Sequence, residues 1–345
     1  MNNIIKGVLK FPKNYSKNNL EYWNNFTGIV EKIYNDVNND KKGVIANYIP
    51  ELANINDDLF GISIFSIDGV EFNIGDTNTM ISLQSCSKPI TYGIALEEYG
   101  EDIVHNFVGK EPSGRNFNEL CLNSDGLPHN PLINAGAIMC TSLILPNETQ
   151  SKRFNFIKSF WNKLIDDNSK NQNISFNNSI YLSEKETADR NYCLGYMMQE
   201  KKAFKNGINN QLQREWKRGD LQNNLELYFQ ICSLELKLYN VALMSATLAN
   251  KGINPKTGNQ IFKYNNLKNI LSLMLTCGMY DYSGEWIYHI GIPAKSGVSG
   301  LIYGVVPNKM GIAVYSPKLD RLGNSHKGIE FFKKLSLETD IHIFN

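Results

Sequence analysis

A chain of 345 residues is long enough to bury a large core, either in one big domain or in two of ordinary size. Its composition, with 42% hydrophobic and 20% charged residues, is that of a globular protein, and a formal net charge of +1 gives no electrostatic sign of a partner such as nucleic acid or an anionic membrane. No stretch approaches the roughly eighteen uninterrupted apolar residues of a membrane span.

Cysteine and histidine residues are scattered along the chain without C-x-x-C pairs or the spacing of metal ligands. We therefore expect reduced thiols, no bound metal and a cytoplasmic protein. The first twenty residues carry lysines and no acid before Glu21, but they have no arginine and no apolar core of a signal peptide. A secretory signal is not expected, and a mitochondrial presequence stays open as the alternative.

The chain begins with a polar stretch, residues 1 to 22, that we expect to form a loose arm. From 23 to 34, aromatic and aliphatic residues recur at helical spacing and predict a first amphipathic helix. Residues 62 to 74 then alternate on either side of Asp68-Gly69, a pattern typical of a hairpin with a type I′ turn. The first part of a sheet is expected over about 57 to 84.

The segment 83 to 89, LQSCSKP, opens an apolar stretch that runs to residue 99 and predicts a helix. Ser85 and Lys88 are three residues apart near its start and so share one face, which allows a serine–lysine dyad. Free N–H groups and the helix dipole favour a developing oxyanion at Ser85, and a partly buried lysine can lose its proton and act as base. Cys86 points away from this face, and we expect a buried structural thiol.

The middle of the chain, about 101 to 275, has a mostly helical pattern with several loops, among them the asparagine- and serine-rich stretch 167 to 179. Strand signals return at 286 to 291, 298 to 306 and 310 to 315, with the last two joined by a turn at 307 to 309. An amphipathic helix is predicted from about 326 to 337. The fold class is therefore α+β: one antiparallel sheet built from about 57–84 and 285–345, with an inserted helical lobe.

A second motif lies among the late strands, where residues 293 to 300 read PAKSGVSG. A lysine, a hydroxyl residue and a glycine at a strand edge resemble the K-T-G element that faces S-x-x-K in penicillin-recognising acyl enzymes. We expect the active site between sheet and lobe, where Ser85 and Lys88 meet Lys295.

With these motifs the sequence closely resembles the glutaminase family, whose members have a serine β-lactamase and DD-peptidase-like fold and hydrolyse L-glutamine to glutamate and ammonia. The resemblance covers roughly residues 24 to 340 and implies one catalytic domain over 23–345. It rests on the segments 75–77, 83–89, 109–114, 128–138, 189–191, 247–252, 277–284 and 293–298.

The resemblance also implies residue roles. Ser85 would be the acylated nucleophile and Lys88 its base, and the backbone N–H groups of Ser85 and Val298 would form an oxyanion hole. Tyr280 and Tyr228 would lie beside the dyad, and one of them would relay the proton to departing ammonia. The implied substrate contacts are Tyr48, Gln84, Ser85, Asn134, Glu184, Asn191, Tyr228, Tyr280 and Val298.

The chemistry of glutamine agrees with this set of residues. The free amino acid carries an ammonium, a carboxylate and a neutral amide, so a selective site needs one carboxylate for the ammonium and neutral donors for the carboxylate. Glu184 together with Asn134 and Asn191 meets that description.

Other properties follow from the resemblance as expectations. No cofactor is required, the assembly is a homodimer or homotetramer, and phosphate is a possible activator through residues 114 to 120. Two rival readings stay open: an enzyme acting on β-lactams, which normally needs export, and an inactive protein that senses glutamine. The absence of an S-D-N triplet between the two motifs weakens the first of them, so that a tyrosine must fill that role.

Overall fold

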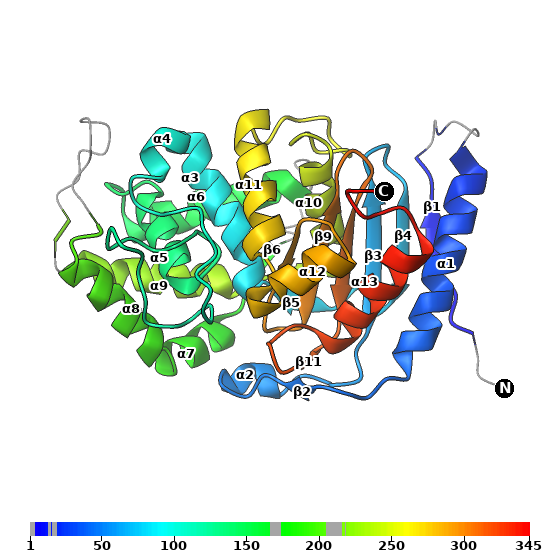
Figure 1. Ribbon diagram of the computed structural model, residues 1–345, viewed down its shortest axis with the longest axis horizontal. Coiled ribbons are helices and arrows are strands. Elements are labelled where there is room, and N and C mark those ends of the chain that lie inside the picture. Colours follow the sequence, from blue (N-terminus) through cyan, green and yellow to red (C-terminus); the bar gives the residue numbers. More distant parts are fainter. Residues whose placement is uncertain (1–3, 13–14, 16–18, 166–173, 205–215, 218) are drawn as a thin grey trace.

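The structure is a computed structural model that describes residues 4–345 except 13–14, 16–18, 166–173, 205–215 and 218. A six-stranded antiparallel sheet occupies one half and a helical lobe the other (Figure 1). The sheet has the strand order β1-β4-β3-β10-β9-β8. In that order, the strands are Val8–Lys10, Glu71–Gly75, Gly61–Ser66, Met310–Tyr315, Leu301–Val306 and Ala294–Ser296.

Early and late parts of the chain meet at the centre of this sheet. Strand β3 pairs with β10 over its whole length, from Gly61 opposite Tyr315 to Ser66 opposite Met310. Strands β9 and β10 form the predicted hairpin around residues 307–309. The predicted α+β arrangement, one antiparallel sheet built from distant parts of the sequence, is confirmed. The expected first part of the sheet, about 57 to 84, is wrong at its end, because Met80–Ser82 pair with Leu234–Lys237 in a separate sheet of the lobe.

Successive side chains of the central strand β10 belong to two separate hydrophobic cores, one on each face of the sheet. In β10, Ile312 and Val314 belong to the core beneath α1, α12 and α13, whereas Ala313 and Tyr315 belong to the core of the helical lobe. This division follows from the strand period of two, which sends successive side chains to opposite faces.

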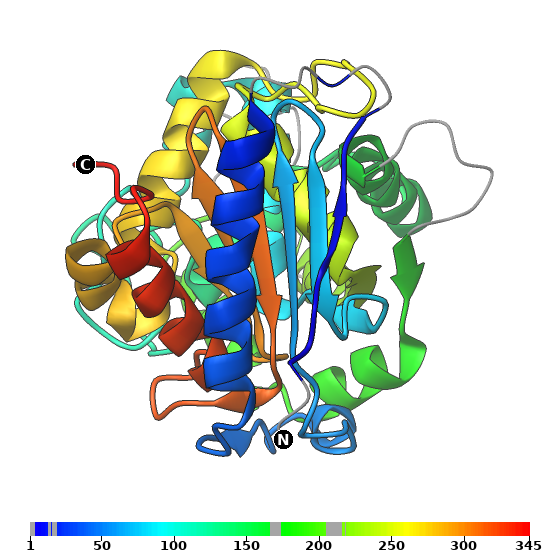
Figure 2. The same cartoon turned by 90° about the vertical axis from the view of Figure 1, so that its right-hand side faces the viewer.

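Helices cover both faces of the sheet. Over one face lie α1 (Leu20–Asn38) and α13 (His326–Glu338), in contact with each other (Figure 2), together with α12 (Ser283–His289). On the opposite face, α10 (Leu238–Ala249) packs directly on β3, β9 and β10. The two amphipathic helices predicted near the ends of the chain are therefore confirmed.

The helical lobe carries a small sheet of its own. Strands β5, β7 and β6 pair in that order, with β7 in the middle, and a two-stranded ribbon of β2 and β11 lies apart from both sheets.

None of the helices in the described part of the chain is long and apolar enough to cross a membrane. The remaining elements are β2 (Val44–Ile45), α2 (Pro50–Ala53), β5 (Met80–Ser82), α3 (Lys88–Tyr99), α4 (Glu101–Val104), α5 (Asn134–Leu143), α6 (Gln150–Ile165), β6 (Ile174–Phe176), α7 (Asn178–Glu186), α8 (Asp189–Glu200), α9 (Asp220–Cys232), β7 (Leu234–Lys237), α11 (Tyr264–Cys277) and β11 (Lys318–Leu319).

Two expectations for the N-terminal part are wrong. Within the supposed loose arm, Val8–Lys10 form β1 and pair with β4 at the edge of the sheet. The hairpin turn is not of type I′, because Gly69 alone in the turn has a positive φ, of 86°. The Gly69 N–H donates to Ser66 O and the Ser66 N–H to Val70 O, which is the pattern of a type I turn followed by a glycine bulge.

The strand predicted over 286–291 is also wrong, since this segment continues α12 to His289. Trp286 is buried and its Nε1 donates to Ile292 O at 2.7 Å, whereas Tyr288 is 80% exposed. A short aromatic run fits either a strand or one helical turn, and here tertiary packing decides. Of the loop predicted over 167–179, residues 167–173 lie outside the described part, and 174–176 form β6.

Candidate active site

Ser85 lies in a 3₁₀ turn, Gln84–Ser87, that leads directly into α3. Ser85 and Lys88 are both buried, at 8% and 1% exposure. The preceding residue, Gln84, has a φ of 46°, a left-handed conformation that is rare outside glycine. The sharp change from β5 into this turn brings the Ser85 side chain to the boundary between sheet and lobe.

Lys88 is linked to two asparagines of the lobe. Its Nζ donates to Asn134 Oδ1 at 2.6 Å, and Asn134 Nδ2 donates to Asn191 Oδ1 at 2.9 Å. Asn134 begins α5 and Asn191 lies in the first turn of α8. Burial lowers the pKa of Lys88 to about 8, so that roughly a tenth of the amine is neutral at pH 7.

Glu184 is the buried carboxylate of the site. It lies in α7 at 7% exposure, and its Oε2 accepts a hydrogen bond of 3.3 Å from Gln84 Nε2. Burial raises the pKa of Glu184 to about 7, while the Gln84 donor and the nearby Lys88 lower it. A buried carboxylate of this kind gains from a cationic partner.

Tyr280 and Lys295 form the sheet side of the site. Tyr280 has a φ of 55°, and the Lys295 Nζ lies 4.5 Å from the centroid of its ring. Lys295 is fully buried in the edge strand β8 and donates to Ser296 O at 2.8 Å. Burial, and then repulsion from Lys88, lowers the pKa of Lys295 to about 7.

The Tyr280 hydroxyl faces Ser85. Burial raises the pKa of Tyr280, and the hydroxyl of Ser85 partly offsets that rise. Yet within the described part of the chain the Tyr280 oxygen has no partner in good hydrogen-bond geometry. A buried phenol without a partner is ready to bind a group that enters the site.

Cys86 is set apart from this chemistry. Its Sγ points to the carbonyl oxygens of Lys295 and Leu301 at 3.6 and 3.5 Å, and the residue is fully buried. Burial raises the pKa of its thiol to about 12. The prediction of a buried structural thiol is confirmed.

A cavity of about 100 Å³ brings the predicted residues together. Every predicted substrate contact lines it except Tyr280, which lines a neighbouring pocket, and Lys88 lies behind Asn134. The Tyr48 side chain is half exposed at the mouth of this region. The predicted residues that line the cavity are Tyr48, Gln84, Ser85, Asn134, Glu184, Asn191, Tyr228 and Val298.

Several lining residues were not singled out from the sequence. Cys232 lies four residues after Tyr228 on α9, a spacing that places both on one helix face and could have indicated it. Arg190 neighbours Asn191 in a motif already noted, and it adds a cation to the wall. The others are Ile49, Phe117, Asn118, Thr187 and Ala188.

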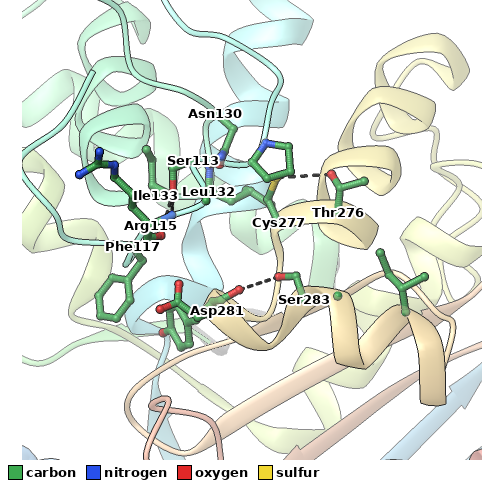
Figure 3. A pocket seen from close by; sticks show the side chains of 15 residues that line it. Ser113, Arg115, Phe117, Asn130, Leu132, Ile133, Thr276, Cys277, Asp281 and Ser283 are labelled. Atoms are coloured by element: carbon green, nitrogen blue, oxygen red, sulfur yellow. Dashed lines mark hydrogen bonds between the residues drawn. The ribbon is translucent and has the colours of Figure 1, made fainter. Parts of the chain in front are cut away.

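A larger pocket of about 620 Å³ adjoins the cavity. It lies between the loop that carries Arg115 and Phe117 and the turn that carries Asp281 and Ser283 (Figure 3). Phe117 lines both spaces and its ring lies 4.5 Å from that of Tyr280, so these two rings stand between them. The smaller cavity is the better candidate for chemistry, because Ser85 and Glu184 line it and not the larger pocket.

No group of three or more histidine, cysteine, aspartate or glutamate side chains in the described ranges is arranged to hold a metal ion. The arrangement offers instead a buried hydroxyl, an amine that loses its proton readily, a carboxylate and several amides. These groups suit acyl transfer from a small zwitterionic ligand.

Known proteins that resemble this chain are glutaminases. The glutaminase family model matches residues 43–344. The chain is 46% identical over 320 residues to the mitochondrial liver isoform of glutaminase from Rattus norvegicus, which covers 93% of this chain and 51% of that protein. It is 41% identical over 317 residues to a glutaminase of Trichormus variabilis, covering 92% of this chain and 89% of that protein.

Solved structures share the fold. A probable glutaminase, ybaS, superposes with a TM-score of 0.84 at 31% identity, over 93% of this chain and 99% of the other. The native form of Mglu gives a TM-score of 0.81 at 32% identity, over 91% of this chain and 72% of the other. The predicted β-lactamase-like architecture is confirmed by these neighbours. The chain spans about half the length of the mammalian relatives it matches.

Proposed function

This chain belongs to the glutaminase family, and from that premise we propose that it hydrolyses the side-chain amide of L-glutamine to L-glutamate and ammonia. Ser85 is the proposed nucleophile and Lys88 its base. One observation carries the proposal: a buried lysine of lowered pKa follows, three residues later, a serine that lines a small cavity together with a buried carboxylate.

In the acylation step, neutral Lys88 accepts the Ser85 proton as the hydroxyl oxygen attacks the side-chain amide carbon of glutamine. The backbone N–H groups of Ser85 and Val298 are proposed to bind the oxyanion of the tetrahedral intermediate. The carbon–nitrogen bond then breaks, the nitrogen takes up a proton and leaves as ammonia, and a γ-glutamyl ester remains on Ser85. Water attacks the ester, gives up a proton to Lys88, and releases glutamate while Ser85 regains its hydrogen.

Tyr280 is the stronger candidate for the proton relay to the leaving nitrogen. Its hydroxyl faces Ser85 and has no competing partner in good geometry among the described residues, and its raised pKa keeps it protonated. Tyr228 lines the cavity and lies against Cys232. Burial alone lowers the pKa of Lys88, whereas the pKa of the neighbouring Lys295 is lowered by burial and then by repulsion from Lys88, because two like charges in one buried site raise the energy of both.

For substrate binding, Glu184 is proposed to accept the ammonium group and Asn134 and Asn191 to donate to the carboxylate. Arg190, which lines the same cavity, adds positive charge that suits a carboxylate. Homodimers or homotetramers, independence from any cofactor and a possible activation by phosphate stay predictions from the resemblance. A cytoplasmic location stays a prediction from the cysteine pattern, with a mitochondrial one as the alternative.

The test is ammonia release from L-glutamine by the purified protein, with and without phosphate, beside Ser85→Ala. We expect release by the unaltered protein and none by Ser85→Ala, with an unchanged circular dichroism spectrum. Equal release by both proteins would refute the nucleophile assignment. Glutamine binding without release by either would favour a sensor, and turnover of a chromogenic cephalosporin would favour the β-lactam reading.

A further inference from the structure

Ser82, a serine outside the predicted site, contacts the side-chain amide of Gln84, which belongs to the site. We propose that Ser82 is a positioning residue that fixes the Gln84 side chain with its amino group toward Glu184, so that Glu184 stays an acceptor for the ammonium of a bound amino acid. The inference rests on the proposed function, which supplies that ligand.

The pairing of β5 with β7 sets the position of Ser82. Ser82 is the last residue of β5, opposite Glu235 of β7, and the following Leu83 N–H donates to Leu234 O at 2.8 Å. This register brings Ser82 beside Cys232, the last residue of α9. Ser82 is only 4% exposed, so its hydroxyl depends on protein partners.

The direction of the hydrogen bonds is forced by the chemistry of the first acceptor. Ser82 Oγ lies 3.1 Å from Cys232 O, a carbonyl at a helix end that carries no hydrogen. Ser82 must therefore donate its only hydrogen there, and its oxygen can only accept from Gln84, whose Nε2 lies 3.2 Å away. A Gln84 oxygen in that place would face the Ser82 oxygen with no hydrogen between them.

The second hydrogen on Gln84 Nε2 then reaches Glu184 Oε2, at 3.3 Å. In the flipped orientation the Gln84 carbonyl oxygen would face the carboxylate, and two acceptors repel each other. The observed orientation also leaves Gln84 Oε1 as the atom that this residue can offer to a ligand in the cavity, which Gln84 lines. Ser82 thus determines which atoms Gln84 and Glu184 offer to a ligand in the cavity.

The orientation of the Gln84 amide affects the pKa of Glu184 and so the charge of this carboxylate. Burial raises its pKa to about 7, and the hydrogen bond from Gln84 is the largest effect that lowers it. The other titratable or charged groups around it are Tyr48, Lys88, Arg190, Tyr228 and Cys232. Without a fixed donor the pKa of Glu184 rises further, so binding of an ammonium group should fail at a higher pH than in the unaltered protein.

The experiment compares the pH profiles of kcat and kcat/KM for Ser82→Ala, Ser82→Thr and the unaltered protein, with L-glutamate affinity measured by calorimetry. For Ser82→Ala we expect KM at pH 7 to rise about three- to tenfold, as loss of one buried hydrogen bond implies, with little change in kcat. The acid limb of kcat/KM should move to higher pH while that of kcat stays, and Ser82→Thr, which keeps the hydroxyl, should restore both.

Two further variants separate positioning from mere packing. In a Gln84→Ala background, Ser82→Ala should cause no additional shift of the acid limb, because its effect passes through Gln84. Ser245→Ala is the matched control: this buried serine donates to Gly304 O at 2.7 Å, away from the cavity, and its loss should leave the acid limb in place. If Ser82→Ala does not fold, Ser82→Cys, a weaker donor of similar shape, should show a smaller shift in the same direction.

The outcomes are distinguishable. An acid limb in Ser82→Ala or Ser82→Cys that overlays the limb of an active unaltered protein overturns this inference alone. An unaltered protein that neither releases ammonia nor binds L-glutamate overturns the proposed function, and this inference with it.

Discussion

Lys88 Nζ and Asn134 Oδ1 are joined by a hydrogen bond of 2.6 Å inside the lobe. An amide oxygen accepts without carrying a charge, so it holds the amine in place and leaves it free to lose its proton. The choice of an amide over a carboxylate at residue 134 therefore matters for the proposed base.

Asn134→Asp places a carboxylate at the same point. An opposite charge at this distance should raise the pKa of Lys88, about 8 in the unaltered protein, by roughly one to three units. We expect kcat at pH 7 to fall tenfold or more and the rising limb of the kcat profile to move to higher pH. Asn134→Ala, which removes the contact without adding charge, should lose activity without that shift. An unmoved limb in Asn134→Asp would contradict Lys88 as base.

Tyr280→Phe keeps the ring against Phe117 and Lys295 and removes only the hydroxyl. If Tyr280 relays the proton, kcat should drop about a hundredfold, the lower range for general acid catalysis, with KM changed only a few-fold. Tyr228→Phe is the matched variant at the tyrosine that lines the cavity, and it should have the smaller effect on kcat. Steady-state measurements of kcat and KM for both variants test this. A larger loss of kcat in Tyr228→Phe than in Tyr280→Phe would assign the relay to Tyr228.

Lys295→Met tests the buried lysine through stability. The pKa of Lys295 is lowered to about 7, whereas an unfolded lysine keeps its proton to about pH 10. Between pH 7 and 9 the unfolded state therefore binds more protons, and the cost of burying the residue is relieved as pH rises. We expect the free energy of unfolding of the unaltered protein, relative to Lys295→Met, to rise by about 2 kcal/mol over that range.

Urea denaturation at pH 7, 8 and 9 measures this difference. Lys295→Arg serves as comparison, since a guanidinium stays charged throughout and should be the least stable of the three proteins at pH 9. A constant gap between the unaltered protein and Lys295→Met would show that Lys295 does not change its charge here.

Gly136→Ala should disturb the start of α5. A Cβ at Gly136 would lie 1.8 Å from the carbonyl oxygen of Asn130, and this glycine is only two residues from Asn134. We expect a loss of about 1–3 kcal/mol in the free energy of unfolding together with reduced activity. The control is Gly28→Ala in α1, where a Cβ meets nothing within 4 Å and helix propensity predicts a gain of about 0.5–1 kcal/mol. Urea denaturation compares the two, and similar effects would contradict the close approach.

Where local pattern determines structure, the sequence was a sufficient guide. The helix behind Ser85, the hairpin of β9 and β10 and the terminal helices α1 and α13 all follow from periodicity and turn residues. The errors lie where distant contacts decide. Val8–Lys10 become a strand only because β4 lies beside them, and the α12 segment is helical because Trp286 packs into the core under α13.

The candidate site divides in the same way. Ser85 and Lys88 could be paired from their spacing alone, and Glu184, Asn134 and Asn191 came from the resemblance. Phe117 borders the cavity because segments far apart in the sequence converge there, and no single stretch of sequence records that. The role inferred for Ser82 depends on the register of β5 with β7, which is also a long-range fact.

The position of β10 at the centre of the sheet has a consequence for biosynthesis. β3 is made early but finds its partner only when residues 310 to 315 emerge, so most of the chain must be synthesised before the sheet can close. Until then β3 presents an unpaired apolar edge, the kind of surface on which nascent chains aggregate. Pairing over such a separation is slow to form, so a ribosome-bound chain that stops short of β10 should depend on chaperones.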